Sequence, residues 1–409
     1  MLQARDGLPC ALLSINMLNF KIYNDVMGYS EGDALLKAFA RILEREAPRP
    51  VLVARMLADA FLVLFPYKGK EELVTYCEAY SRALNGFIVS REQNYQLELR
   101  SGICCVEDSD ASDINSLLDR ANMALKTIKM KGAAQWKFYD RTMRDKLLRE
   151  KDLEIRMEKA LADGEFLVYI QPKYWVGTRA LAGGEALVRW KSPDQGFLSP
   201  GEFIPLFEKN RFIVKLDQFM FTSVCGLLRQ WLDAGIEPRP LSVNVSQMQF
   251  HTPDFVERYI GIKSQYAIPD GLLELEFTES IFFDNVALLS SAVHEFRRAG
   301  IKCSIDDFGA GYSSLNVLKA LPVSVLKLDG MFFRTAKDDE QANIVIRNIM
   351  RMAGELKMAT VAEGVETPEQ VAFLETTGCD IIQGYVFARP MPAAEFTELL
   401  AGEGGHAER

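Results

Sequence analysis

Two adjacent carboxylates, Asp306 and Asp307, follow an apolar stretch of the chain and precede a turn that contains two glycines. Neighbouring side chains of a strand point to opposite faces, so both can serve one site only where the backbone turns at a strand end. Carboxylates that lie close together repel each other unless a cation lies between them. The pair predicts either a divalent metal site at the C-terminal end of a strand or an ordinary Asp-Asp turn.

Further polar residues stand at the ends of other apolar stretches. They are Glu185, Asn244, Glu276, Glu279, Lys327, Asp329, Glu363, Glu366 and Gln383. Each one alone could be a turn or capping residue. A buried cluster of them would be unfavourable without a metal or a ligand to compensate it. Their number therefore favours a functional site.

The types of these residues indicate which metal they would bind. The chain has three His, and none lies in these segments. Carboxylates and one amide suit Mg²⁺ or Mn²⁺ and disfavour zinc, and two bridged cations are a common device for displacement at phosphorus. Lys327 could orient the attacking water or help to deprotonate it, and Arg189 could hold a phosphate oxygen.

Apolar strands alternate with helical stretches from about residue 165 onward. The predicted strands are 167–170, 186–190, 241–245, 272–277, 303–305, 325–328, 359–362 and 381–382. Eight strands separated by helices predict a β/α barrel, in which function lies at the C-terminal ends of the strands.

The first part of the chain has a different pattern. Strands are predicted at 10–18, 51–56, 60–65, 97–106 and 137–139, and helices at 20–28, 31–44, 71–84 and 113–130. This β-α-α-β-β-α-β-α-β order predicts a compact α/β domain whose sheet contains antiparallel strands.

A highly charged stretch joins the two parts and predicts an exposed connecting helix, either a spacer or a signalling lever. We expect a first domain at 1–140, the helix at 141–160, the barrel at 161–400 and a flexible tail at 401–409.

The bulk composition excludes several classes of protein. Hydrophobic residues make up 48% of the chain and charged residues 25%, and the net charge of −9 argues against binding along a nucleic-acid backbone. Seven Cys without a paired spacing indicate reduced thiols. No apolar run approaches a membrane span and no signal peptide is present. We expect a cytoplasmic protein, or the cytoplasmic part of a longer, membrane-attached one, because the first strand begins abruptly.

From about residue 150 to 398 a set of motifs resembles one family. The motifs are Glu-Ala-Leu-Val-Arg-Trp at 185–190, Glu-Phe-Ile-Pro at 202–205, Asn-Val-Ser at 244–246, Glu-Phe-Thr-Glu at 276–279, Asp-Asp-Phe-Gly-Ala-Gly-Tyr-Ser-Ser at 306–314, Lys-Leu-Asp at 327–329, Glu-Gly-Val-Glu-Thr at 363–367 and Gln-Gly-Tyr at 383–385. This set resembles the EAL family of cyclic di-GMP phosphodiesterases. The resemblance implies a modified TIM barrel with one antiparallel strand, and hydrolysis of cyclic di-GMP to linear pGpG with two Mg²⁺ or Mn²⁺ ions per site.

The resemblance also implies roles for individual residues. It implies metal ligands at Glu185, Asn244, Glu276, Asp306 and Asp307. It implies that Lys327 holds the water nucleophile, that Glu363 is a further metal-site acid, and that Glu279 anchors the loop after Asp307 and couples it to dimer contacts. Substrate-binding or water-holding roles fall on Gln171, Arg189 and Gln383. The bulky Lys173-Tyr174-Trp175 stretch could alter the rim of the pocket.

Residues 1 to about 140 resemble a GGDEF domain, the diguanylate cyclase fold, with its first helix missing. The signature position has Leu-Ala-Asp-Ala-Phe at 57–61, so side chains replace both glycines that let the turn approach phosphate. A metal-binding Asp aligns with Asn16, which argues against cyclase activity. Asn24 and Asp33 align with positions that recognise guanine, so GTP binding without turnover and a purely structural or dimerising role both remain open.

Three functions follow from these resemblances. The first is an active phosphodiesterase that forms a homodimer through its barrel. The second is a catalytically silent cyclic di-GMP receptor, and the third is a signalling scaffold. Silent members of the family usually lose ligands from the set above, and this chain retains all of them, so the phosphodiesterase is favoured.

Overall fold

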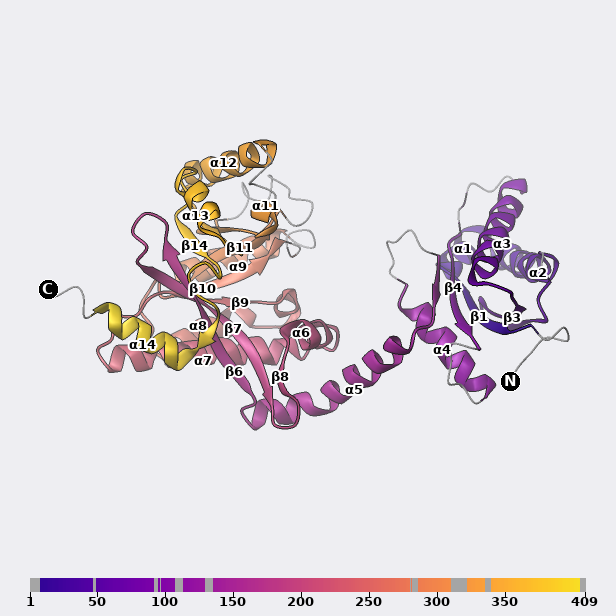
Figure 1. The fold of residues 1–409 in the computed structure, drawn as a ribbon, viewed down its shortest axis with the longest axis horizontal. Coiled ribbons are helices and arrows are strands. Elements are labelled where there is room, and N and C mark those ends of the chain that lie inside the picture. Colours follow the sequence, from indigo (N-terminus) through magenta and orange to yellow (C-terminus); the bar gives the residue numbers. More distant parts are fainter. Residues whose placement is uncertain are drawn as a thin grey trace. The chain divides into compact units, whose positions relative to one another are not determined.

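The computed structural model divides into two compact units, Met1–Asp152 and Leu153–Arg409 (Figure 1). It describes residues 8–46, 49–91, 95, 97–106, 113–128, 135–279, 281, 286–309, 322–334 and 340–404. The glycine-containing turn at 310–314, which sequence motifs place beside the acidic pair, lies outside the described residues.

The first unit is built on one sheet with the strand order β2-β3-β1-β4-β5. Its strands are β1 (Cys10–Met17), β2 (Leu52–Leu57), β3 (Ala60–Pro66), β4 (Leu99–Cys105) and β5 (Trp136–Phe138), and its helices are α1 (Phe20–Met27), α2 (Tyr29–Arg45), α3 (Lys70–Ser90) and α4 (Ile114–Lys126). All neighbouring strands are antiparallel except β4 and β5. The predicted order of elements and the mixed sheet are confirmed.

Both faces of this sheet are covered. Ala11, Leu13 and Ile15 on one side of β1 pack into a core with α2 and α3, whereas Leu12 on the other side packs with α4. Asp113 caps α4 by accepting hydrogen bonds from two backbone N–H groups. The prediction placed the end of this helix at residue 130, but α4 ends at Lys126.

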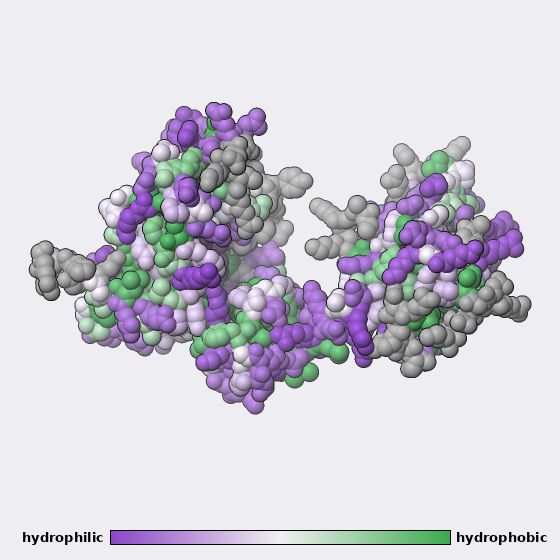
Figure 2. All heavy atoms as spheres, viewed as in Figure 1, coloured by the Kyte–Doolittle hydropathy of each residue, from purple (hydrophilic) through white to green (hydrophobic). Residues whose placement is uncertain are grey.

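Helix α5 (Arg141–Ala162) is the predicted connecting helix. Only Leu153 and Ala160 are buried along it, and Ile155 is 80% exposed. Hydrophilic side chains cover much of its surface (Figure 2). The charged pattern in the sequence therefore predicted its exposure correctly.

The second unit contains a closed ring of eight strands in the order β6-β14-β13-β12-β11-β10-β9-β7, with β7 pairing back to β6. The strands are β6 (Phe166–Trp175), β7 (Leu181–Ser192), β9 (Leu241–Asn244), β10 (Leu273–Thr278), β11 (Lys302–Phe308), β12 (Val325–Leu328), β13 (Ala359–Ala362) and β14 (Ile381–Gln383). Strand β6 runs antiparallel to both neighbours, and the other pairs in the ring are parallel. This confirms the modified TIM barrel.

Short strands β8 (Gly196–Leu198) and β15 (Met391–Pro392) extend the sheet beside β7 and β6. The surrounding elements are α6 (Pro200–Lys209), α7 (Ile213–Asp233), η1 (Gln247–His251), α8 (Phe255–Gln265), α9 (Val286–Arg298), α11 (Met331–Arg334), α12 (Glu340–Glu355), α13 (Pro368–Glu375) and α14 (Ala393–Gly404). The Glu-Phe-Ile-Pro motif at 202–205 lies near the start of α6, where Ser199 and Glu202 form a capping box. Within the described residues, no helix is both long and apolar enough to cross a bilayer.

Candidate active site

Lys327 on β12 lies at the centre of a buried acidic cluster and has no exposed surface. Its Nζ lies 2.6 Å from a carboxylate oxygen of Glu276, 2.6 Å from Glu363, 3.0 Å from Asp306 and 3.5 Å from Glu185. These carboxylates come from four different strands or strand ends of the barrel. Burial by itself would disfavour the charged amine, but the surrounding carboxylates raise the pKa of Lys327 well above its usual value.

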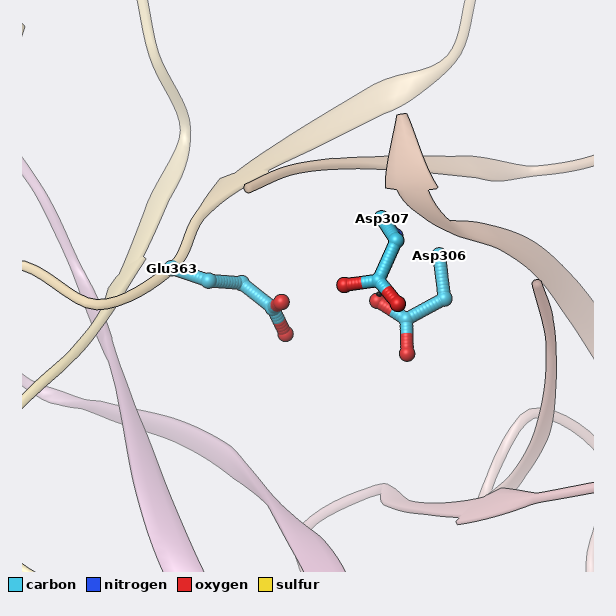
Figure 3. Close-up of side chains that lie close together, drawn as sticks. All are labelled: Asp306, Asp307 and Glu363. Atoms are coloured by element: carbon cyan, nitrogen blue, oxygen red, sulfur yellow. Dashed lines mark hydrogen bonds between the residues drawn. The ribbon is translucent and has the colours of Figure 1, made fainter. Parts of the chain in front are cut away.

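Asp306 and Asp307 reach the same site through an irregularity in β11. The sequence predicted that the strand ends before the pair, but β11 continues to Phe308. The pairing of β11 with β12 shifts register between Ile305 and Phe308, and Asp307 has a positive φ of 53°. This bulge turns the two side chains toward one region, where oxygens of Asp306, Asp307 and Glu363 all lie within 4.8 Å of one another (Figure 3).

Glu185 on β7 is held by amides on both sides. Asn244 Nδ2 at the end of β9 donates to Glu185 Oε1 at 2.7 Å, and Gln383 Nε2 on β14 donates to Oε2 at 2.6 Å. Gln383 Nε2 also lies 3.1 Å from Gln171 Oε1 on β6. The structure thus brings Asn244, Gln383 and Gln171 together around a single carboxylate of the cluster.

Glu279 lies just beyond β10 and contacts a different part of the site. Its Oε2 accepts the backbone N–H of Gly309 at 3.0 Å. Gly309 follows β11 directly. The contact is consistent with the predicted anchoring role, although the rest of that loop lies outside the described residues.

The site contains more acidic than basic side chains. Five carboxylates (Glu185, Glu276, Asp306, Asp307 and Glu363) surround two buried lysines, Lys327 and Lys173. Burial and the neighbouring acids raise the pKa of Glu185 and Glu363, and they raise the pKa of Asp307 to about 6. An excess of carboxylates at close range needs protons or a cation.

The donor set fits a divalent cation. Its ligand atoms are carboxylate oxygens together with the side chain of Asn244, and oxygen ligands are those that Mg²⁺ and Mn²⁺ prefer. The cluster of Asp306, Asp307 and Glu363 satisfies the spatial requirement for a shared ion. Glu366 is exposed and joins it through no described contact. Asp329 accepts the backbone N–H of Met331, and its charge helps to raise the pKa of Asp307.

A cavity of about 660 Å³ opens beside the cluster. Asn244, Glu279 and Asp307 form its edge with the acidic site, and Arg189 from β7 lines its wall. Burial lowers the pKa of the half-buried Arg189, but its ordinary value is high enough to keep the guanidinium charged. A positively charged wall beside a carboxylate cluster suits a phosphodiester that reaches from the cavity to a metal.

The far wall of the same cavity carries two acids that sequence reasoning missed. They are Asp217 on α7 and Glu208 on α6. Asp217 accepts hydrogen bonds from Ser246 N at 3.0 Å and Gln249 Nε2 at 3.2 Å, and burial raises its pKa to about 7. An acid among the buried apolar residues of α7 was the signal that could have found it.

Sequence reasoning also missed the role of a third residue, Lys173 on β6. It considered Lys173 only as part of the bulky Lys173-Tyr174-Trp175 stretch. It stands two positions after Gln171, so both side chains point to the same face of the strand. Its Nζ lies 2.9 Å from Glu276 Oε1 and 2.7 Å from Ser242 Oγ. It therefore belongs to the interior of the barrel.

In the first unit the two predicted guanine-binding residues differ in exposure. Asp33 is exposed, whereas Asn24 Oδ1 is buried without a hydrogen-bond partner. Asn24 Oδ1 lies so close to Gly32 that a Cβ atom added to this glycine would be 1.8 Å away. The turn between β2 and β3 places Ala58 at a positive φ of 51°, a conformation that favours glycine.

Comparison with known families assigns both units. The family model for the EAL domain matches residues 155–390, and the model for the diguanylate cyclase GGDEF domain matches residues 1–135. Among curated proteins, the cyclic di-GMP phosphodiesterase NbdA of Pseudomonas aeruginosa is 31% identical over 96% of this chain and 50% of its own length. The cyclic di-GMP phosphodiesterase PdeR of Escherichia coli is 30% identical over 96% of this chain and 59% of its own.

Solved structures give a similar result. The structure titled PaMucR phosphodiesterase in complex with c-di-GMP is 34% identical, with a TM-score of 0.57, over 60% of this chain and 99% of that chain. The EAL enzyme Bd1971, in a form with cAMP and cyclic di-GMP bound, is 26% identical with a TM-score of 0.59, over 85% of this chain and 82% of that chain. The chain spans about half the length of the curated relatives that it matches.

Proposed function

The chain belongs to the EAL domain family, and we propose that it hydrolyses one phosphodiester bond of cyclic di-GMP to give linear pGpG. The observation that carries this proposal is the contact of one buried lysine, Lys327, with four carboxylates, one of which, Asp306, belongs to the bulged pair Asp306 and Asp307. Such a site suits displacement at phosphorus by water, because it combines sites for cations with a fixed hydrogen-bond donor.

Mg²⁺ or Mn²⁺, two per site, is the proposed cofactor. Glu185, Asn244, Glu276, Asp306 and Asp307 would hold the ions, with Glu363 as a further acid. When bound, such ions polarise the phosphoryl oxygens and lower the pKa of bound water.

Lys327 would hold the attacking water. Its raised pKa keeps the amine protonated at neutral pH, so it donates a hydrogen bond and does not accept the proton. Glu363, whose carboxylate lies 2.6 Å from Lys327 Nζ, is better placed to accept the proton from water. Gln383 would orient Glu185, and through it the ligand set.

The cavity of about 660 Å³ would hold one half of the substrate. Guanine presents two adjacent N–H donors, which pair well with carboxylates. Asp217 and Glu208 supply such acceptors on the far wall, and Arg189 supplies a charge for the phosphate. Gln171, which bonds Gln383, would contact the substrate from the opposite side of Glu185.

The first unit is proposed to regulate or to dimerise the chain, without making cyclic di-GMP. Ala58 stands at a positive φ where glycine is favoured, and Ala60 and Asn16 pair across the sheet where the cyclase would need acids. Asn24 and Asp33 remain candidates for binding GTP. A homodimer through the barrel is proposed on the family resemblance.

A catalytically silent receptor for cyclic di-GMP is the second candidate function, and one experiment separates the two. The purified chain is incubated with cyclic di-GMP and Mg²⁺ or Mn²⁺, with and without GTP, and the products are separated by chromatography. Formation of pGpG supports the hydrolase, and its stimulation by GTP supports a sensor role for the first unit. Tight binding without turnover supports the receptor, and the absence of both refutes the proposed substrate.

A further inference from the structure

Lys173 is a buried lysine that the mechanism above does not use. It lies on β6, the strand of the eight-membered ring that is antiparallel to both of its neighbours. Its partners in the sheet are Gly183 on β7 and Gln383 on β14. Its side chain is 6% exposed and crosses the interior of the barrel to reach β9 and β10. Burying an ammonium group is unfavourable, so the charge of Lys173 must be compensated by polar or charged partners.

The contacts of Lys173 are specific. Its Nζ donates to Glu276 Oε1 at 2.9 Å and to Ser242 Oγ at 2.7 Å. The two partners are neighbours across the pairing of β10 with β9, since Glu274 pairs with Ser242 and Glu276 lies two residues further along. The ammonium group of Lys173 thus contacts one hydroxyl group and one carboxylate.

Glu276 is bound differently at its two oxygens. Oε1 contacts Lys173, and Oε2 contacts Lys327 at 2.6 Å. Lys327 in turn contacts Glu185, Asp306 and Glu363. Oε2 is therefore the oxygen that faces the acidic cluster, while Oε1 faces away from it toward Lys173.

The two lysines also set the charge of Glu276. Burial alone would raise the pKa of this carboxyl group, but Lys173 and Lys327 together hold it below its usual range. The pKa of Glu185 and Glu363 shifts in the opposite direction. Both lysines therefore act on the same carboxylate, one at each of its oxygens.

We propose that Lys173 is a positioning residue for cation binding: it fixes Glu276 Oε1 so that Oε2 stays directed into the acidic cluster as a ligand. The inference rests on the proposed metal-dependent function. Partners that orient a ligand commonly change metal affinity by about 10-fold to 100-fold when they are removed. Lys173 does not contact the reacting atoms in this account, since its effect passes through Glu276.

The test measures binding of Mn²⁺ alone, from the electron paramagnetic resonance signal of the free ion, to the full chain and to three variants. Lys173→Met keeps most of the buried stem and removes the charge. Ser242→Ala removes the second contact of Lys173, together with a hydrogen bond from the same hydroxyl to Glu276. Lys263→Met is the matched control, because Lys263 is an equally buried lysine of the same unit whose partners are Asp270 and the carbonyl of Ala299.

We expect Lys173→Met to weaken Mn²⁺ binding by about 10-fold to 100-fold, and Ser242→Ala by about fivefold. Lys263→Met should leave the affinity unchanged even if it lowers the melting temperature. Excess Mn²⁺ should restore most of the turnover of Lys173→Met, with the KM for cyclic di-GMP close to that of the parent chain.

An unchanged Mn²⁺ affinity in folded Lys173→Met overturns the proposal, as does an equal loss in Lys263→Met or the absence of Mn²⁺ binding by the parent chain. If Lys173→Met does not fold, an unchanged affinity in Ser242→Ala overturns it. Weakened Mn²⁺ binding in a chain that never hydrolyses cyclic di-GMP would support the role of Lys173 and refute the proposed function, so the two failures are distinguishable.

Discussion

Replacing Lys327 with Met removes the cation that four carboxylates share and keeps most of the volume of the side chain. Lys327 has no exposed surface, so bulk solvent would do little to screen the carboxylates that lose it. Lys173 contacts only Glu276 among the carboxylates that Lys327 contacts. In the absence of metal, Asp306 and Glu363 would therefore be left with no lysine in contact, and Glu185 with only the longer-range attraction of Lys173.

The size of the effect follows from the burial of the cluster. Removing one partner of a buried ion pair costs about 3–5 kcal/mol, and about 2–4 °C of melting temperature is lost per kcal/mol in a domain of this size. The barrel of the metal-free variant should therefore melt roughly 6–20 °C below the parent chain. Saturating Mg²⁺ or Mn²⁺ should recover much of this loss, because the ion takes over neutralisation of the same carboxylates, whereas hydrolysis should not recover.

The loss should also depend on pH. Without Lys327 the pKa values of Glu185 and Glu363, which burial already raises, rise further above their unfolded values, so the folded state binds more protons than the unfolded state. Stability then falls as the pH rises through that window. The difference between variant and parent should be larger at about pH 8 than at about pH 6.

Thermal melting in EDTA and in excess metal, at both pH values, is the assay. Lys215→Met is the matched control, because Lys215 forms an exposed ion pair with Glu158, and exposed pairs contribute little. Equal melting temperatures for Lys327→Met and the parent chain in EDTA would show that Lys327 does not stabilise the acidic cluster. So would full hydrolytic activity of the variant in excess metal.

Three further outcomes are expected. Glu185→Gln keeps the shape of the side chain beside its amide neighbours Asn244 and Gln383. It should lower kcat by at least about 10²-fold while the circular dichroism spectrum is unchanged. Turnover near the parent rate would contradict the assignment of Glu185 to the site. Asp217→Ala should raise the KM for cyclic di-GMP by about tenfold with a smaller change in kcat, through the loss of a carboxyl acceptor for guanine. An unchanged KM would refute a role for Asp217 in binding guanine. Because the pKa of metal-free Asp307 is raised to about 6, the carboxyl group must release a proton to bind a cation below that pH, so Mn²⁺ affinity should fall as the pH drops through 6, and Asp307→Asn should flatten that dependence.

Sequence patterns predicted the framework of the barrel well. Buried parallel strands form continuous apolar runs, so β12 and β13 were predicted with their observed ends. The eight alternating strands predicted a barrel, whereas the antiparallel direction of one strand came from the family resemblance. Strand β6 pairs with the next strand, β7, on one side, but its partner on the other side, β14, is distant in the chain and no local pattern predicts that pairing.

Two features of the site could not be predicted from local sequence. The bulge at Asp307 depends on the shifted pairing of β11 with β12 and on a positive φ, and neither follows from residue types. Lys173 meets Ser242 and Glu276, which are 69 and 103 positions away in the chain. A lysine in a strand predicts exposure by default, and only the folded barrel shows that it is buried.

The most direct test of metal-dependent hydrolysis at this site is turnover of cyclic di-GMP in water enriched in ¹⁸O, followed by mass spectrometry of the product. Metal-dependent attack by water predicts linear pGpG that carries one ¹⁸O atom on its terminal phosphate, formed with Mg²⁺ or Mn²⁺ and not in EDTA. Product that forms equally in EDTA, or that carries no label, would contradict attack by a water molecule held between Lys327 and the bound ions.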